Sequence, residues 1–273
     1  MGIFHSKCFS QTQLVRVGDD KRQFTLYVPA QLDTSQKVPL LLNFHGSGMT
    51  AIEQMMYSQT NTIADREGIL IAYPQGKNND WNVGFGMDYD DGNDVQFIDT
   101  LLIKLVKNYP IDPNKIYAVG LSRGGFFIHR LIAELPNKIK GFASIGAPIP
   151  NRVKEQLAPQ TLVKAMYVHG TADHIVAING KVDAYLSVEK SLEFWKKNNK
   201  VESVLNTTHF DAPLDETSVS VQLYGENQTV CSIIIKNGGH TWPGADPFNI
   251  GFPLGKTSQD FDFNTYFWEF LNH

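Results

Sequence analysis

The chain has 273 residues, of which 42% are hydrophobic and 19% charged, a composition typical of a globular protein with a substantial buried core. Its formal net charge is −4 and it contains no run of Lys or Arg, so it lacks the basic surface that nucleic-acid binding requires. The only two cysteines, Cys8 and Cys231, exclude a disulfide scaffold and a four-cysteine zinc site, and favour two free thiols over one bridge. No apolar run approaches the length of a membrane span.

The N-terminus leaves the compartment undetermined. Residues 1–14 lack the long apolar segment of an intact signal peptide. Residues 1–6 fit the M-G-x-x-x-[ST] pattern of N-myristoylation, and Cys8 offers a second acylation point. Because this match is short, a lipid anchor is the less favoured alternative, and the localisation stays open.

Short apolar runs alternate with helical patterns along the chain. We predict strands at residues 23–28, 38–44, 69–73, 115–120, 141–145, 165–169, 218–223 and 231–235. We predict helices at residues 52–66, from 93 or 94 onward, and at 125–135, 186–197 and 259–271. This alternation predicts a single α/β domain over residues 1–273, with a mostly parallel central sheet and helices on both faces.

A long polar segment interrupts this alternation at residues 75–93, which are rich in Gly, Asn and Asp around Trp81 and Phe85. Such a loop inside a compact domain is usually functional. Either Asn93 or Asp94 could act as the N-cap of the helix that follows.

The sequence Gly120-Leu121-Ser122-Arg123-Gly124 matches the G-x-S-x-G motif of a nucleophile elbow. A predicted strand runs into it and a predicted helix runs out, which is the context that this motif requires. Ser122 is therefore the candidate nucleophile of an α/β-hydrolase. The backbone N–H of Arg123 is a candidate oxyanion donor at the start of the helix.

A serine nucleophile needs a neutral imidazole and a carboxylate, which follow it in the order acid, then histidine, in α/β-hydrolases. His240 lies in a glycine-rich loop directly after the strand at 231–235, and Asp173 follows the strand at 165–169. Asp211 and Asp215 are rival acids, but neither follows a clear strand. The sequence thus predicts a triad of Ser122, Asp173 and His240.

The second oxyanion donor is expected after an earlier strand. Residues 38–44 run into His45-Gly46-Ser47-Gly48, and the favoured donor there is the N–H of Ser47, with Gly46 the less favoured alternative. His45 is a candidate either for contact with the substrate or for shaping this turn.

Five segments occur in one order along the chain: His45 to Gly48, the Trp81 loop leading to Asn93-Asp94-Val95-Gln96-Phe97-Ile98, the Ser122 elbow, His169-Gly170-Thr171-Ala172-Asp173, and Gly239-His240-Thr241-Trp242-Pro243-Gly244. Together they resemble the polyhydroxybutyrate depolymerase, feruloyl esterase and acetylxylan esterase family of α/β-hydrolases. The resemblance spans most of the chain, and the G-H-T-W-P-G loop is its most specific element.

This resemblance implies hydrolysis of small or oligomeric carboxylic esters without metal or organic cofactor. It also implies that Trp242 and Trp81 line the acyl pocket, against the alternative that they only pack beside loops. Arg123 departs from the family, which more often has a small or amide side chain after the nucleophile. Its guanidinium could select an anionic substrate group, or pair with an acid. A small-peptide hydrolase and a non-catalytic binding module on the same fold are the alternative functions.

Overall fold

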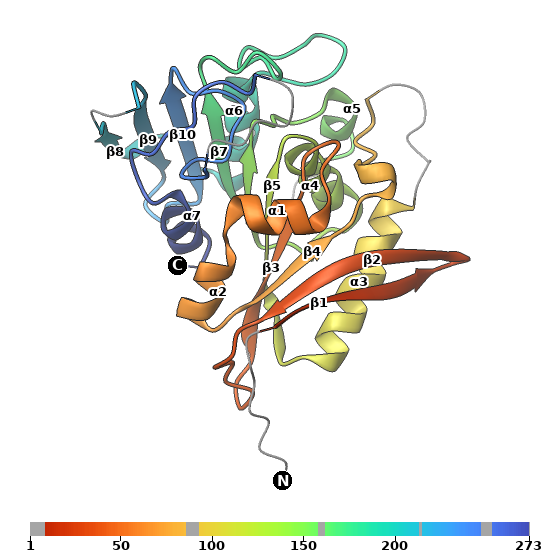
Figure 1. The fold of residues 1–273 in the computed structure, drawn as a ribbon. Coiled ribbons are helices and arrows are strands. Elements are labelled where there is room, and N and C mark those ends of the chain that lie inside the picture. The colour runs from red at the N-terminus through yellow and green to blue at the C-terminus, as the bar shows by residue number, and fades with distance from the viewer. Residues whose placement is uncertain (1–8, 86–92, 158–161, 213–214, 247–252, 273) are drawn as a thin grey trace.

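A computed structural model describes residues 9–85, 93–157, 162–212, 215–246 and 253–272, and its sheet confirms the expected α/β architecture (Figure 1). The described strands, in chain order, are β1 (Phe9–Val17), β2 (Asp20–Val28), β3 (Val38–Phe44), β4 (Leu70–Pro74), β5 (Ile111–Leu121), β6 (Gly141–Ile145), β7 (Lys164–Gly170), β8 (Val204–Phe210), β9 (Ser218–Tyr224) and β10 (Val230–Lys236). All of them belong to one sheet in the order β1-β2-β4-β3-β5-β6-β7-β10-β9-β8.

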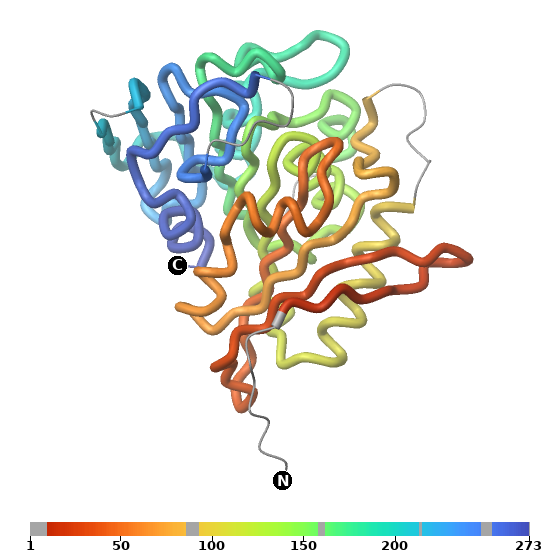
Figure 2. Tube along the Cα trace, viewed as in Figure 1, coloured from red at the N-terminus to blue at the C-terminus, as the bar shows by residue number. Residues whose placement is uncertain are grey.

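The centre of the sheet is parallel and its two margins are antiparallel. β4, β3, β5, β6, β7 and β10 pair in parallel. β1 and β2 extend the sheet at one margin, and β9 and β8 at the other, all by antiparallel pairing. In the view of Figure 2 the red N-terminal hairpin and the blue C-terminal segments lie at opposite sides of the molecule.

Helices cover both faces of the sheet, as the prediction required. The described α-helices are α1 (Ala51–Ser58), α2 (Asn61–Glu67), α3 (Asp94–Asn108), α4 (Arg123–Glu134), α5 (Asn151–Lys154), α6 (Val188–Asn199) and α7 (Phe263–Asn272). The buried side chains of α3, α4, α5 and α6 join one apolar cluster with one face of the strands, and those of α1, α2 and α7 join a second cluster on the other face. The strands are therefore buried from both sides, which explains their nearly continuous apolar sequences.

The structure corrects several details of the predicted elements. The helix expected over residues 52–66 is two helices, because Gln59 adopts a left-handed conformation that ends α1. β1 and β8 were not predicted, and β8 is mostly exposed, so it lacks the apolar pattern of a buried strand. β8 contains His209.

The N-cap position of α3 falls on Asn93, one of the two residues that the sequence predicted for it. Asn93 stands at the N-cap position with φ of 52° but makes no capping hydrogen bond through its side chain, and Asp94 is the first helical residue. The Asp94 carboxylate instead binds Arg22 and the N–H of Asn82.

The myristoylation pattern and Cys8 lie outside the described residues. Cys231 is a buried free thiol in β10, and its burial raises its pKa. None of the described helices has the length and apolarity needed to cross a membrane. A single domain over the whole chain stays a prediction.

The α3 helix offers a matched test of how much its packing stabilises the fold. Leu105 is 0% exposed in the core, whereas Ile103 on the same helix is 59% exposed. We expect Leu105→Ala to lower the free energy of unfolding by about 3 kcal/mol, because it removes buried contacts and leaves a cavity. Ile103→Ala should change it by less than about 0.5 kcal/mol. Urea denaturation of both variants measures the difference, and equal losses would contradict this packing arrangement.

Candidate active site

The candidate site lies where neighbouring parallel strands end at the same edge of the sheet. Phe44 at the end of β3 pairs with Gly120 of β5, and Leu121 pairs with Ile145 at the end of β6. On the other side of β6, β7 pairs with both β6 and β10, and its last residue, Gly170, pairs with Ile235 of β10. The segments that follow these strand ends carry the residues predicted from sequence to form the site, except Trp81, which follows β4.

Ser122 occupies the strained turn expected of a nucleophile elbow. It connects β5 directly to α4 with φ of 53° and ψ of −120°, a conformation that L-residues rarely adopt. Its N–H donates to the carbonyl of Ile145 at 2.8 Å, and its side chain is half-buried. Strain at this position holds the hydroxyl out of the sheet instead of directing it into the helix.

The glycines of the motif are required by close backbone approach. A Cβ at Gly120 would lie 2.6 Å from the carbonyl carbon of Gly124, and a Cβ at Gly124 would lie 2.4 Å from the carbonyl oxygen of Phe44. Both distances are shorter than real contacts allow, so any side chain here would push α4 away from β3 and β5.

The structure brings Asp173 and His240 together although they are far apart in sequence. Nδ1 of His240 lies 2.7 Å from Oδ2 of Asp173, and the two side chains are 5% and 0% exposed. Because an ionised carboxylate only accepts hydrogen bonds, Nδ1 carries a proton, and in the neutral ring Nε2 then has the free lone pair. Among the described residues, the buried Nε2 has no hydrogen-bond partner.

The Asp173 carboxylate is held ionised by its surroundings. Its Oδ1 accepts from the N–H groups of Ile175 and Val176 at 2.9 and 2.8 Å. Burial alone would raise the pKa of Asp173, but the hydrogen bond and charge interaction with His240, together with the Val176 N–H, lower the pKa below its ordinary value. His169 also lies beside this carboxylate, with Nε2 at 3.5 Å from Oδ2, and donates to the carbonyl of Val176 at 2.8 Å.

Gly146 links the imidazole to the elbow. Its φ is +59°, and a Cβ added there would lie 2.8 Å from both Cε1 and Nδ1 of His240. The preceding residue, Ile145, supplies the carbonyl that holds the Ser122 N–H. The imidazole and the elbow therefore contact two consecutive residues at the end of β6, Gly146 and Ile145. Sequence analysis did not single out Gly146, although a glycine directly after a buried strand was a usable signal.

Residues 45–48, which we call the oxyanion turn, lie against the elbow. A Cβ added to Gly46 would lie 3.6 Å from Cβ of Ser122. The Gly48 N–H donates to the carbonyl of Asn79 at 2.7 Å. In the described part of the chain no acceptor is bonded to the N–H of Ser47 or of Arg123, which leaves both donors available for an oxyanion.

Three residues that were predicted to bind substrate are buried in this structure, and their contact with substrate stays a prediction. Trp242 and His45 are 0% exposed and Trp81 is 2% exposed. Trp242 donates through Nε1 to Asn264 at 3.0 Å and packs against Phe263, and Trp81 stacks on Phe127 at 4.7 Å. Both indole N–H groups find acceptors inside the fold, which is what the packing alternative expects.

His45 shapes the oxyanion turn, which is the other role that the sequence left open for it. Its Nε2 accepts from the Gly76 N–H at 2.9 Å, so the ring proton is on Nδ1, 2.8 Å from the carbonyl of Gly46. Burial lowers the pKa of His45, against the opposing effect of the Gly46 carbonyl, and this favours the neutral ring.

Arg123 pairs with an acid. Its Nε lies 3.1 Å from Oδ1 of Asp80, and its guanidinium lies 5.1 Å from the centre of the Phe85 ring. Sequence analysis did not identify Asp80, because this acid stands 43 residues away in the polar loop and no local pattern marks it. Within the described residues, no group of three or more His, Cys, Asp or Glu side chains is arranged to hold a metal ion.

Comparisons with known proteins find similarity to esterases. No protein-family model matches the chain. NocK of Nocardia uniformis subsp. tsuyamanensis, a protein assigned as an esterase, is 28% identical over 227 residues, 76% of this chain. The bifunctional acetylxylan esterase/xylanase XynS20E of Neocallimastix patriciarum is 31% identical over 158 residues, 57% of this chain. Feruloyl esterase B of Piromyces equi is 24% identical over 192 residues, 65% of this chain.

The matched regions span 66%, 22% and 35% of the lengths of these three relatives. Among solved structures, the acetyl xylan esterase of Aspergillus awamori superposes with a TM-score of 0.67 at 15% identity, covering 85% of this chain and 94% of that one. This likeness shows a shared fold. The polyhydroxybutyrate depolymerase part of the resemblance stays a prediction. The chain is a relative of the acetylxylan and feruloyl esterases and has an α/β-hydrolase fold.

Proposed function

We propose that the chain is a serine carboxylic ester hydrolase that acts through Ser122, His240 and Asp173. The buried hydrogen bond between His240 and Asp173 carries this proposal, because it leaves His240 Nε2 without a partner among the described residues. The His240 ring packs against Gly146, next to the Ile145 carbonyl that binds the N–H of Ser122. A hydroxyl nucleophile needs such a base, with its tautomer fixed by a carboxylate. The esterase relatives support the same class of reaction.

The proposed mechanism has two steps. His240 Nε2 takes the Ser122 proton while Oγ attacks the ester carbonyl carbon, and the N–H groups of Ser47 and Arg123 bind the oxyanion. The bond to the alcohol oxygen then breaks, and His240 returns the proton to the leaving alcohol, which leaves an acyl-enzyme. Water, deprotonated by His240, attacks the acyl-enzyme, and the acid leaves as Ser122 regains its proton.

We propose small or oligomeric esters as substrates, with feruloyl, acetyl and hydroxyalkanoate groups as the candidates. Relatives are named for acetylxylan and feruloyl ester hydrolysis. No cofactor and no nucleic-acid partner is part of the proposal. A panel of these three ester types measures the preference, and matched amide substrates test the alternative of a small-peptide hydrolase.

Replacing the nucleophile tests the central assignment. We expect Ser122→Ala to lower kcat/KM for 4-nitrophenyl acetate by about 10⁴-fold or more, because no hydroxyl remains to form the acyl-enzyme. A fluorophosphonate should label the wild-type chain on Ser122, as seen by mass spectrometry, and should not label the variant. An unlabelled, inactive wild-type chain would instead favour a non-catalytic binding module.

The acid side of the pH profile tests the base. His240 must be neutral to accept a proton, so kcat/KM should fall about tenfold per pH unit once His240 protonates. The pKa of Asp173 is already lowered, so loss of its charge follows only at lower pH. His209→Asn, at an exposed position in β8, should leave the profile unchanged. A flat profile down to about pH 4 in folded protein would exclude His240 as the base.

Substitutions at two glycines distinguish the effect of displacing the imidazole from the effect of backbone strain. Gly146→Ala places a methyl group within 2.8 Å of the His240 ring, whereas at Gly18, with a similar φ of +58°, the added Cβ meets nothing within 4 Å. We expect both variants to lose about 1–2 kcal/mol of stability because alanine disfavours positive φ. Only Gly146→Ala should lower kcat, by about 100-fold, since the displaced imidazole no longer reaches Ser122. Equal kcat values for the two variants would contradict this.

A further inference from the structure

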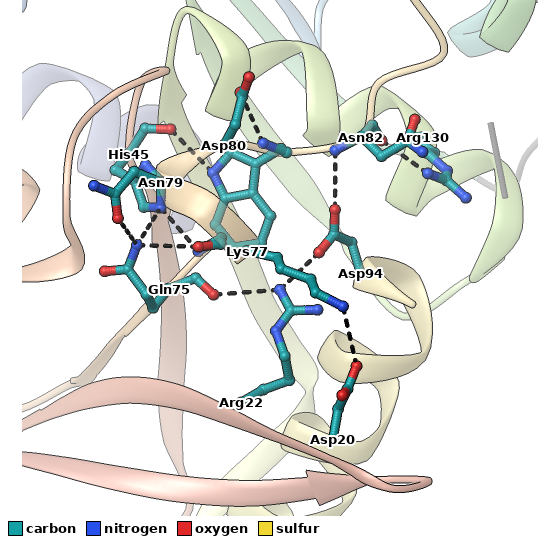
Figure 3. Close-up of polar contacts among 12 residues, drawn as sticks. Asp20, Arg22, His45, Gln75, Lys77, Asn79, Asp80, Asn82, Asp94 and Arg130 are labelled. Atoms are coloured by element: carbon teal, nitrogen blue, oxygen red, sulfur yellow. Dashed lines mark hydrogen bonds and ion pairs between the residues drawn. The ribbon is translucent and has the colours of Figure 1, made fainter. Parts of the chain in front are cut away.

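We infer that residues 75–82 form a positioning loop for the oxyanion turn and that the buried ion pair of Arg22 and Asp94 anchors this loop. The inference rests on the proposed function, since it assigns a role in that reaction to residues outside the triad. The loop follows β4 and runs between the oxyanion turn and the N-terminus of α3 (Figure 3). None of its residues was assigned a role above, apart from Trp81 as a candidate for packing or substrate contact and Asp80 as the partner of Arg123.

The loop forms hydrogen bonds with polar groups of the oxyanion turn other than the N–H of Ser47. The carbonyl of Asn79 accepts from the Gly48 N–H at 2.7 Å, and the Gly76 N–H donates to Nε2 of His45 at 2.9 Å. Nε1 of Trp81 donates to the carbonyl of His45 at 3.1 Å. These three bonds fix the orientation of the turn at both ends, and the N–H of Ser47 remains free between them.

Buried charges hold the first and last residues of the loop. Arg22 donates to the Gln75 carbonyl at 3.3 Å and to Oδ1 of Asp94 at 2.6 Å. The other carboxylate oxygen of Asp94 accepts from the Asn82 N–H at 2.9 Å, and Arg130 donates to the Asn82 carbonyl at 2.8 Å. Figure 3 shows these contacts continuing from Arg22 through Asp94 to Arg130.

A stabilising role alone does not account for this ion pair. The side chains of Arg22 and Asp94 are only 5% and 3% exposed, and removing two charges from water offsets much of their attraction. What such a pair supplies is a fixed geometry, because each charge has one well-defined partner arrangement in a dry environment. Here that geometry fixes both ends of the loop.

The same loop also reaches the second oxyanion donor. Oδ1 of Asp80 accepts from its neighbour Trp81 N–H at 2.8 Å and lies 3.1 Å from Nε of Arg123. Arg123 is the residue whose backbone N–H completes the proposed oxyanion hole. The loop therefore contacts both segments that carry the proposed donors. It holds the Ser47 donor through the oxyanion turn and the Arg123 donor through the Asp80 side chain, and so sets the distance between them.

The decisive experiment replaces Asp94 by Asn, which keeps an oxygen for the Asn82 N–H but removes the charge opposite Arg22. With 4-nitrophenyl butyrate we expect kcat to fall about 10- to 100-fold, because the Ser47 donor shifts, and KM to stay within about twofold. Affinity for a trifluoromethyl ketone, whose adduct with Ser122 carries an oxyanion, should fall by a similar factor. Rates are measured per folded protein, at a temperature where circular dichroism shows the variant to be folded.

Leu105→Ala is the control for destabilisation, because it lies on the same helix as Asp94 but outside the loop and its contacts. It should lower the melting temperature and leave kcat per folded protein and inhibitor affinity at the wild-type values. If Asp94→Asn behaves like this control, the ion pair has a structural role only, and the inference is wrong.

Asp80→Asn provides an independent variant that leaves no buried charge unpaired. We expect kcat to fall about 3- to 10-fold with KM unchanged and with little change in melting temperature, because the side-chain link to Arg123 is weakened. If Asp94→Asn does not fold, Asp80→Asn decides alone, and wild-type kcat in this variant refutes the inference. Failure of the proposed function is distinguishable, since the wild-type chain itself would then lack Ser122-dependent esterase activity.

Discussion

Parallel pairing of the central strands is the constraint on which the site depends, because each parallel strand must leave the sheet at the same edge as its neighbours. Five strands that are adjacent in the sheet obey this constraint: β3, β5, β6, β7 and β10. The segments that follow them contain, in the same order, the oxyanion turn, the elbow, Gly146, Asp173 and His240. Asp173 and His240, which are 67 positions apart in sequence, thus meet without any long loop to bring them there. The antiparallel margins, β1–β2 and β9–β8, widen the sheet without contributing to this edge.

The central strands could be predicted because strands that are buried on both faces have nearly continuous apolar sequences. Residues 38–44 and 141–145 were predicted with the bounds that the structure shows, since apolar residues fill them almost continuously. β8 could not be found this way, because an exposed margin strand is held by hydrogen bonds to β9 and not by burial. The prediction of a single helix over 52–66 was wrong because α1 ends before Gln59, and no composition rule predicts the left-handed conformation of this residue.

Residues of the candidate site could be proposed from sequence where they stand at a strand end, and could not be identified where they depend on long-range pairing. Asp173 and His240 each follow a buried strand, and the structure joins them by a hydrogen bond. Trp242 and Trp81 stand in equally suggestive loops, yet both indoles turn inward, because acceptors at Asn264 and at the His45 carbonyl satisfy their N–H groups. Only the fold reveals such acceptors.

Asp94 and Asp173 are both buried, but their surroundings shift the pKa of the carboxyl group in opposite directions. Burial raises the pKa of Asp94, and its hydrogen bond from Asn82 and the charges of Arg22 and Arg130 only partly oppose this. For Asp173 the hydrogen bonds and the adjacent imidazole outweigh burial and lower the pKa. Asp173 therefore keeps its charge where His240 needs it. The ion pair of Asp94 is less favourable, as expected of a group whose contribution is geometry.

Strain at the elbow and close packing of its glycines are two parts of one arrangement. The positive φ of Ser122 persists only because α4 is pressed against the end of β3, where Gly124 meets the carbonyl of Phe44. That same approach brings the first N–H of α4, on Arg123, close to the turn that begins at His45. A larger residue at Gly124 would relax the strain and separate the two oxyanion donors in a single movement. The candidate nucleophile and the proposed oxyanion hole are therefore set by the same contact between α4 and β3.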